Sequence, residues 1–151
     1  MRIAALLVLV GAASAAEPES GIWKMNPIRS NFSGDTQPRS FTVRVEPHSK
    51  GEVFTLDRVE TDGRATNSST ILYFDGVARD FQQGECSGTQ SSWRMDSQTV
   101  EIFRNCGAGA WTKVVRRTAP QTQLVLEISE QFPGFSFTKY RGTLVTICPN
   151  Y

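Results

Sequence analysis

Apolar and polar residues alternate along much of this chain with a period of two. Residues 41–46 show the pattern most clearly, with Phe41, Val43 and Val45 separated by polar residues, and residues 124–129 repeat it. Such alternation predicts β-strands that bury one face. Residues 135–138 also alternate, and we expect further, shorter or less regular strands around Trp23 and over residues 53–59, 70–74, 77–81, 91–95, 100–104 and 111–117. No stretch after residue 16 has the spacing of an amphipathic helix, so little helix is predicted.

Short clusters of Gly, Pro, Asp and Asn separate the expected strands. They occur at residues 47–51, 61–64, 75–76, 95–97, 105–109, 119–121 and 133–134. These residue types reverse the chain because they adopt positive φ, fix φ or bond their own backbone. The spacing predicts an all-β fold, an antiparallel meander of about eight to ten strands. The meander closes as a barrel or, alternatively, folds as a sandwich.

The first sixteen residues have the pattern of a secretory signal peptide. Arg2 precedes an apolar run over residues 3–10, and small residues at 11–16 favour cleavage after Ala15 or Ala16. The run is too short to span a bilayer, so we expect no stable membrane insertion. The expected product is a single domain over residues 17–151, periplasmic or secreted.

The overall charge gives no reason to expect a polyanionic partner. The 151 residues carry a formal net charge of +1, and 21% of them are charged. Nucleic-acid binding normally needs a strongly basic surface, so we expect no nucleic acid as a partner.

The chain has three cysteines, and in an exported protein two of them are expected to form a disulfide. Cys86 and Cys106 flank a predicted hairpin with a turn at residues 95–97. A three-residue loop would place Arg94 opposite Gln98, and the same register places Cys86 opposite Cys106. A disulfide between them would close a loop of about twenty residues and stabilise the folded state by about 3 kcal/mol. Cys148 is then free on the C-terminal tail, or alternatively takes part in the bridge.

Candidate catalytic groups are sparse. The single histidine, His48, falls in a predicted surface turn, and no serine lies in a recognisable nucleophile motif. The carboxylates near Asp57 and Glu127 fit a solvated strand face better than an acid–base pair. Cysteine and histidine lack zinc-ligand spacing. We therefore expect no enzyme, no metal and no cofactor.

Aromatic residues are the strongest indication of binding. Ordinary core packing accounts for them; alternatively, an eight-stranded barrel would leave a cavity for one small ligand. Under the second interpretation the ligand-lining residues are Trp93, Trp111, Phe74, Phe103 and Phe137.

Residues 21–32 carry a resemblance to a family of small secreted bacterial proteins. The segment has Gly21, Trp23, Lys24 and Asn26, followed by Ser30 and Phe32, and is similar to that family's Gly-x-Trp-Lys-x-Asn…Ser-x-Phe opening. The similarity continues in short pieces at residues 61–63, 73–76 and 94–101. The family is uncharacterised, so the resemblance implies export but no activity.

The Gly21-x-Trp23 pair also resembles the opening of lipocalins, eight-stranded barrels that carry small apolar ligands. In that fold the tryptophan closes one end of the barrel beneath a basic residue, and the resemblance assigns these roles to Trp23 and Arg141. It implies an exported lipocalin-like protein that binds a small apolar or amphipathic ligand. The alternative is an envelope or extracellular interaction protein with a filled core and no small-molecule ligand.

Overall fold

The computed structural model describes residues 20–32, 36–119, 123–133 and 138–149; for residues 119 and 138–149 it describes the backbone. Within these ranges the chain forms strands and turns without a helix. The strands are β1 (Gly21–Met25), β2 (Asn31–Phe32), β3 (Ser40–His48), β4 (Gly51–Val59), β5 (Ala65–Leu72), β6 (Arg79–Gln83), β7 (Cys86–Arg94), β8 (Thr99–Gly107), β9 (Ala110–Ala119), β10 (Gln123–Pro133) and β11 (Thr138–Pro149).

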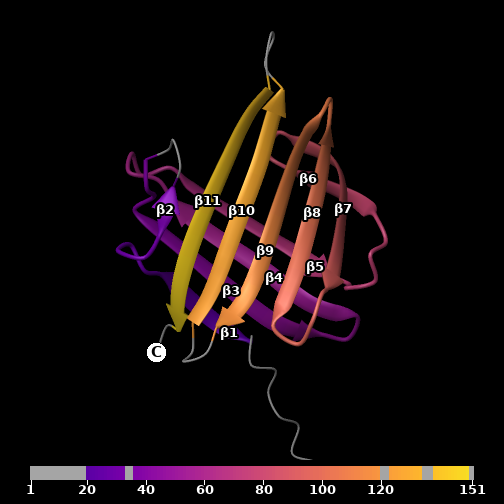
Figure 1. Ribbon diagram of the computed structural model, residues 1–151, viewed down its shortest axis with the longest axis horizontal. Helices are drawn as coiled ribbons and strands as arrows, with labels where there is room; N and C mark the ends of the chain where they lie inside the picture. Colours follow the sequence, from indigo (N-terminus) through magenta and orange to yellow (C-terminus); the bar gives the residue numbers. More distant parts are fainter. Residues whose placement is uncertain (1–19, 33–35, 120–122, 134–137, 150–151) are drawn as a thin grey trace, which may run out of the picture.

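The strands form one antiparallel path that is folded into two layers. Its order is β5-β4-β3-β1-β11-β10-β9-β8-β7-β6, and β2 pairs with β11. Figure 1 shows β6–β11 as one layer, with β1, β3, β4 and β5 crossing behind it. The all-β antiparallel prediction is confirmed. Because β5 and β6 remain edges of the described sheet, the fold is sandwich-like, and the expected closed barrel is not observed.

Side chains, not a backbone ladder, connect the two sheet edges. Ser68 on β5 donates a 2.7 Å hydrogen bond to Gln83 on β6, and Gln90 on β7 donates a 2.8 Å bond to Thr70 on β5. Such bonds hold the layers together without the continuous main-chain pairing that closes a barrel. We call this line of contact between β5 and β6–β7 the seam.

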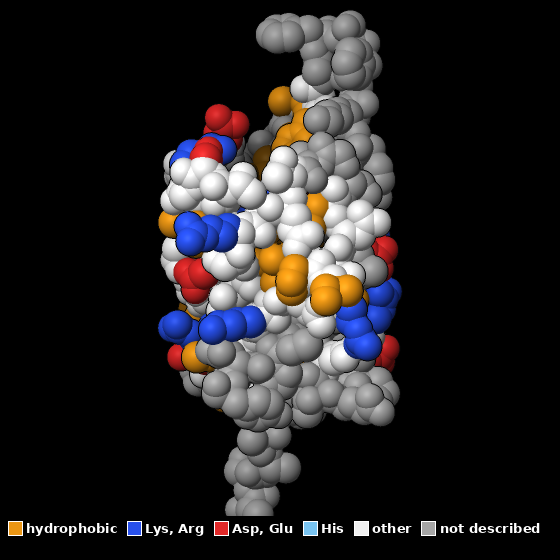
Figure 2. Space-filling model, turned by 90° about the vertical axis from the view of Figure 1, so that its left-hand side faces the viewer, with side chains coloured by type: hydrophobic (Ala, Val, Ile, Leu, Met, Phe, Trp, Pro, Cys, Tyr) orange, Lys and Arg blue, Asp and Glu red, His pale blue; other side chains and the backbone are white. Residues whose placement is uncertain are grey.

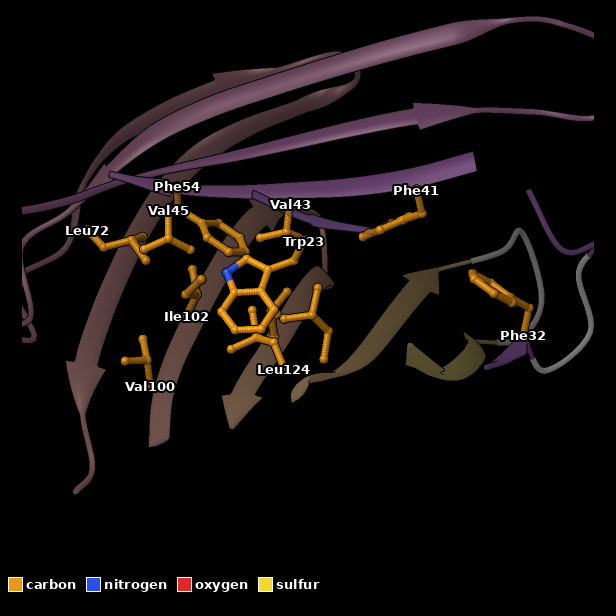
Figure 3. Packing of buried hydrophobic residues seen from close by; sticks show 12 residues of the cluster. Trp23, Phe32, Phe41, Val43, Val45, Phe54, Leu72, Val100, Ile102 and Leu124 are labelled. Carbon is orange, nitrogen blue, oxygen red and sulfur yellow. The ribbon is translucent and has the colours of Figure 1, made fainter. Parts of the chain in front are cut away.

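The hydrophobic core fills the middle of the space between the layers. Figure 3 shows Trp23, Val43 and Phe54 pointing from one layer toward Ile102 and Leu124 on the other. Each of these side chains is at most 5% exposed. The alternation in the sequence explains the arrangement, because every second residue of a strand faces the same side.

A disulfide links Cys86 on β7 to Cys106 on β8, as predicted. The hairpin register differs from the expectation, however: Arg94 lies opposite Val100 and not opposite Gln98. The turn is therefore longer than three residues. A two-residue shift keeps every side chain on its expected face, so the two cysteines still lie on one side of the sheet.

Several expected boundaries are different in the structure. β5 covers Ala65–Leu72, whereas residues 70–74 were expected, because pairing with β4 extends the strand through a polar segment. Cys148, expected on the C-terminal tail, lies in β11 opposite Lys24. It is not part of the disulfide, which joins Cys86 and Cys106. The expected signal peptide at residues 1–16 lies outside the described residues.

The disulfide suggests a non-cytosolic location, since such bonds persist in oxidising compartments. Among the described residues no helix has the length and apolar character needed to cross a membrane.

Candidate functional site

Phe103 and Trp111 stack on each other, but on the outer face of the front layer. Their ring centroids are 6.1 Å apart. Phe103 follows Ile102, which is completely buried, so its side chain points away from the core. Both rings are half-buried. The structure thus brings together two of the predicted lining residues, outside the space between the layers.

Phe74 lies in the connection between β5 and β6, and Trp93 on β7 is bridged to the next residue of that connection, Asp75. Trp93 is 36% exposed and covers Gly76, where a Cβ atom would come within 2.4 Å of the indole nitrogen. Phe74 packs against the edge of the core, and the Arg94 guanidinium lies 4.6 Å from its ring centroid. These contacts give both residues a packing role. Phe137 lies outside the described residues.

Trp23 is buried in the core, with 5% of its surface exposed. On β11 its partner is Pro149, whereas Arg141 pairs with Glu130 on β10. Pro149 lies eight residue steps along the extended strand from Arg141, a distance of about 26 Å. The register therefore places the two residues of the expected closure far apart along the strand.

The interior faces of the strands carry charged residues at both ends of the apolar core. At one end, Glu52 on β4 and Arg116 on β9 form an ion pair, and each side chain is 1% exposed. Arg94 adds a second positive charge, 3.8 Å from the other carboxylate oxygen of Glu52. We call this the paired end. Arg117, the next residue, points outward to Glu127, as expected for consecutive residues of a strand.

A cleft of about 160 Å³ lies between the layers at the other end of the core, which we call the cleft end. Its apolar wall comes from Phe41, Leu56, Val114 and Ile128. The remaining lining residues are polar or charged: Arg58, Thr66, Ser68, Gln83, Arg104, Thr112 and Glu130. A space with one apolar and one polar wall suits an amphipathic molecule.

Arg104 is the most deeply placed charge of the cleft end and is 9% exposed. Its Nε donates a 2.9 Å hydrogen bond to Gln90, and its guanidinium carbon lies 4.6 Å from the Phe81 ring centroid. Its Nη2 atom is buried and has no hydrogen-bond acceptor among the described residues. Burial lowers the pKa of Arg104 to about 10, and the negative charge of Glu130 acts in the opposite direction. Arg104 is therefore a cation at neutral pH.

Arg58 lines the same cleft, but its charge is neutralised locally. Its Nε lies 2.6 Å from a carboxylate oxygen of Glu60, and its Nη2 donates a 3.3 Å hydrogen bond to the other oxygen. The guanidinium carbon lies 5.9 Å from the Phe32 ring centroid. Arg58 thus contributes shape and polarity to the rim.

A larger groove of about 430 Å³ lies beside the seam. Val53, Ile71, Tyr73 and Val77 provide its apolar part. Arg79 stacks on Tyr73 and donates hydrogen bonds to both oxygens of Asp75, which holds the pKa of that carboxyl well below its usual range. The groove is therefore lined by both apolar and charged side chains.

Figure 2 shows the side of the molecule that lies to the left in Figure 1. Hydrophobic side chains gather in the middle of this face, and Lys, Arg, Asp and Glu lie toward its margins.

Arg104 and Glu52 were not among the site residues predicted from the sequence. A usable signal was present, because both continue an interior alternation: Arg104 follows Val100 and Ile102 in steps of two, and Glu52 precedes Phe54 and Leu56. A charged residue on an apolar strand face needs a partner, which makes it a candidate for structure or binding.

Within the described part of the chain, no three His, Cys, Asp or Glu side chains are grouped so as to hold a metal ion. No protein-family model matches the chain, and the search of curated proteins finds no significant match.

Proposed function

We propose that this chain is an exported binding protein that takes a small amphipathic molecule in the cleft between its sheet layers. Export is supported by the signal-peptide pattern of residues 1–16 and by the Cys86–Cys106 disulfide. The central core is filled by side chains, so the ligand enters at the cleft end.

The observation that carries the proposal is unfilled volume beside an apolar wall. The cleft measures about 160 Å³ and is bounded by Phe41, Leu56, Val114 and Ile128. A cavity of about 150 Å³ lined by aliphatic and aromatic side chains accommodates benzene. The apolar part of the ligand is therefore about the size of a benzene ring or a short alkyl chain.

The lipocalin-like interpretation is retained in a reduced form. A carrier of that kind holds its ligand in the interior of a β-structure. Here the interior is divided, because Trp23 and its neighbours fill the middle and leave a cleft at one end. A long lipid chain does not fit such a volume.

Titration of the mature protein, residues 17–151, with hexanol tests the proposal. Saturable chemical-shift changes at Leu56, Val114 and Ile128 are expected. Ile128→Trp should abolish them by filling the cleft, whereas Trp111→Ala on the outer face should leave them unchanged. Absence of saturable hexanol binding to the native protein would refute the proposal. If hexanol binding were lost in Trp111→Ala but not in Ile128→Trp, the site would lie at the outer pair of Phe103 and Trp111.

The second candidate function is an envelope or extracellular interaction protein that uses the groove beside the seam. The observation in its favour is the size of that groove, about 430 Å³, next to the edge strand β5. A photo-crosslinking amino acid at Val77, which is 52% exposed, should then capture a protein partner in the producing cell. The matched control is Phe132, which is 41% exposed. Equal capture at both positions would count against this function.

A further inference from the structure

The cleft end contains a buried hydrogen-bond donor that the described chain does not satisfy. The side chain of Arg104 is nine-tenths buried, and its Nη2 has no acceptor. Buried polar groups in folded proteins are almost always hydrogen-bonded, and charged ones carry the largest penalty when they are not. An orphaned guanidinium N–H in a cleft therefore indicates an acceptor that comes from outside the chain.

The neighbours of Arg104 fix its position but leave its Nη2 atom without a hydrogen bond. Gln90 accepts from Nε and in turn donates to Thr70, so the guanidinium is held by a chain of bonds across β8, β7 and β5. Phe81 lies against the guanidinium. Both of these partners are uncharged, and Glu130 is the acidic group whose negative charge acts on Arg104. Because Nη2 makes no hydrogen bond to it, this N–H remains open to an acceptor from a ligand.

The other charged groups of the cleft limit what that anion is. Arg58 is paired with Glu60, so it adds little net attraction. Glu130 lines the cleft and acts electrostatically on Arg104. A carboxylate gains the hydrogen bond of Arg104 but is repelled by Glu130, and a second negative charge on the ligand would add to that repulsion. One negative charge is therefore favoured over two.

We infer that the ligand is a small monocarboxylate with an apolar body, and that Arg104 Nη2 donates a hydrogen bond to its carboxylate. This inference rests on the proposed function and adds the chemical class of the ligand. The apolar body contacts Phe41, Leu56, Val114 and Ile128, and its size is that of a hexyl or phenyl group. A charge-assisted hydrogen bond to a planar guanidinium is among the stronger ways to fix a carboxylate.

The test compares hexanoate, hexanol and hexylamine at equal chain length by NMR titration of the mature protein. Hexanoate should bind the native protein at least 10-fold more tightly than hexanol, and hexylamine should bind least. In R104Q the advantage of hexanoate over hexanol should disappear while hexanol binds as before. In E130Q hexanoate should bind a few-fold more tightly, because a like charge is removed.

Each result decides one claim. Equal binding of hexanoate and hexanol to the native protein, or an advantage that survives in R104Q, would overturn the inference and leave the proposed function in place. Failure of both ligands to bind would overturn both. If R104Q does not fold, R104K serves as the second variant, because it preserves the charge with a different donor geometry. In R104K the ratio of hexanoate affinity to hexanol affinity should be lower than in the native protein but still above one.

Discussion

The two ends of the interior bury charge in different ways. At the paired end, Arg116 meets the Glu52 carboxylate, and Arg94 completes the cluster. At the cleft end, Arg104 has an amide and an aromatic ring as neighbours, and one of its N–H groups is left without an acceptor. Both arginines lie on the inward face of the same sheet layer, separated by Val100, Ile102 and Val114.

This difference separates structure from binding. A buried charge whose counter-charge comes from the chain is a part of the fold, and its removal leaves the partner exposed to the full desolvation penalty. A buried cation whose N–H group has no acceptor in the described chain, beside unfilled volume, can bind a ligand.

Replacing Glu52 should be the most damaging single change at either end. Glu52→Leu leaves the Arg116 guanidinium buried without its carboxylate, so we expect a loss of about 3–5 kcal/mol in the free energy of unfolding. Urea denaturation followed by tryptophan fluorescence measures it. Adding Arg116→Met should recover most of the loss; a double variant as unstable as the single one would show that the pair is not the cause.

Removing the disulfide should lower the free energy of unfolding by less than Glu52→Leu does, and it should loosen mainly the cleft end. Cys86 and Cys106 join β7 and β8 close to Gln90 and Arg104. Cys86→Ser with Cys106→Ser should lower the free energy of unfolding by about 3 kcal/mol. Amide hydrogen exchange should accelerate around these four residues and stay slow around Arg116. Uniform acceleration would mean that the bridge stabilises both ends equally.

Arg104 itself should contribute little to stability. Arg104→Met removes an incompletely satisfied charge and leaves the Gln90 carbonyl without its donor, so we expect a loss of about 1 kcal/mol. The same urea experiment compares it directly with Glu52→Leu. A loss as large as that of Glu52→Leu would place Arg104 among the structural charges.

The smallest effect concerns the pH dependence of hexanoate binding between pH 6 and 9. Arg104, with a pKa of about 10, stays protonated throughout this range, and a carboxylate with a pKa of about 4–5 stays ionised. Affinity should therefore be flat over the range, fall above pH 10 as Arg104 loses its proton, and fall below pH 5 as the ligand gains one. A midpoint near pH 7 would point to a different titrating group.

Local pattern was sufficient to predict most of the strands and the disulfide. Alternation predicted the buried face of β3, because side chains on a strand have a period of two whatever its neighbours are. The prediction that Cys86 and Cys106 lie on one side of the sheet was correct although the predicted turn was too short, because a two-residue shift does not change the side on which a residue lies. Likewise, the outward direction of Arg117 relative to Arg116 follows from adjacency alone.

Tertiary structure decided what periodicity leaves open. The polar start of β5 is a strand only because β4 pairs with it. The outward placement of Phe103 and Trp111 depends on which face of each strand meets the core, and composition does not specify that. Arg116 and Arg104 have the same parity in the sequence; only the folded chain brings Glu52 to the first and leaves a cleft beside the second, because the partners come from distant strands.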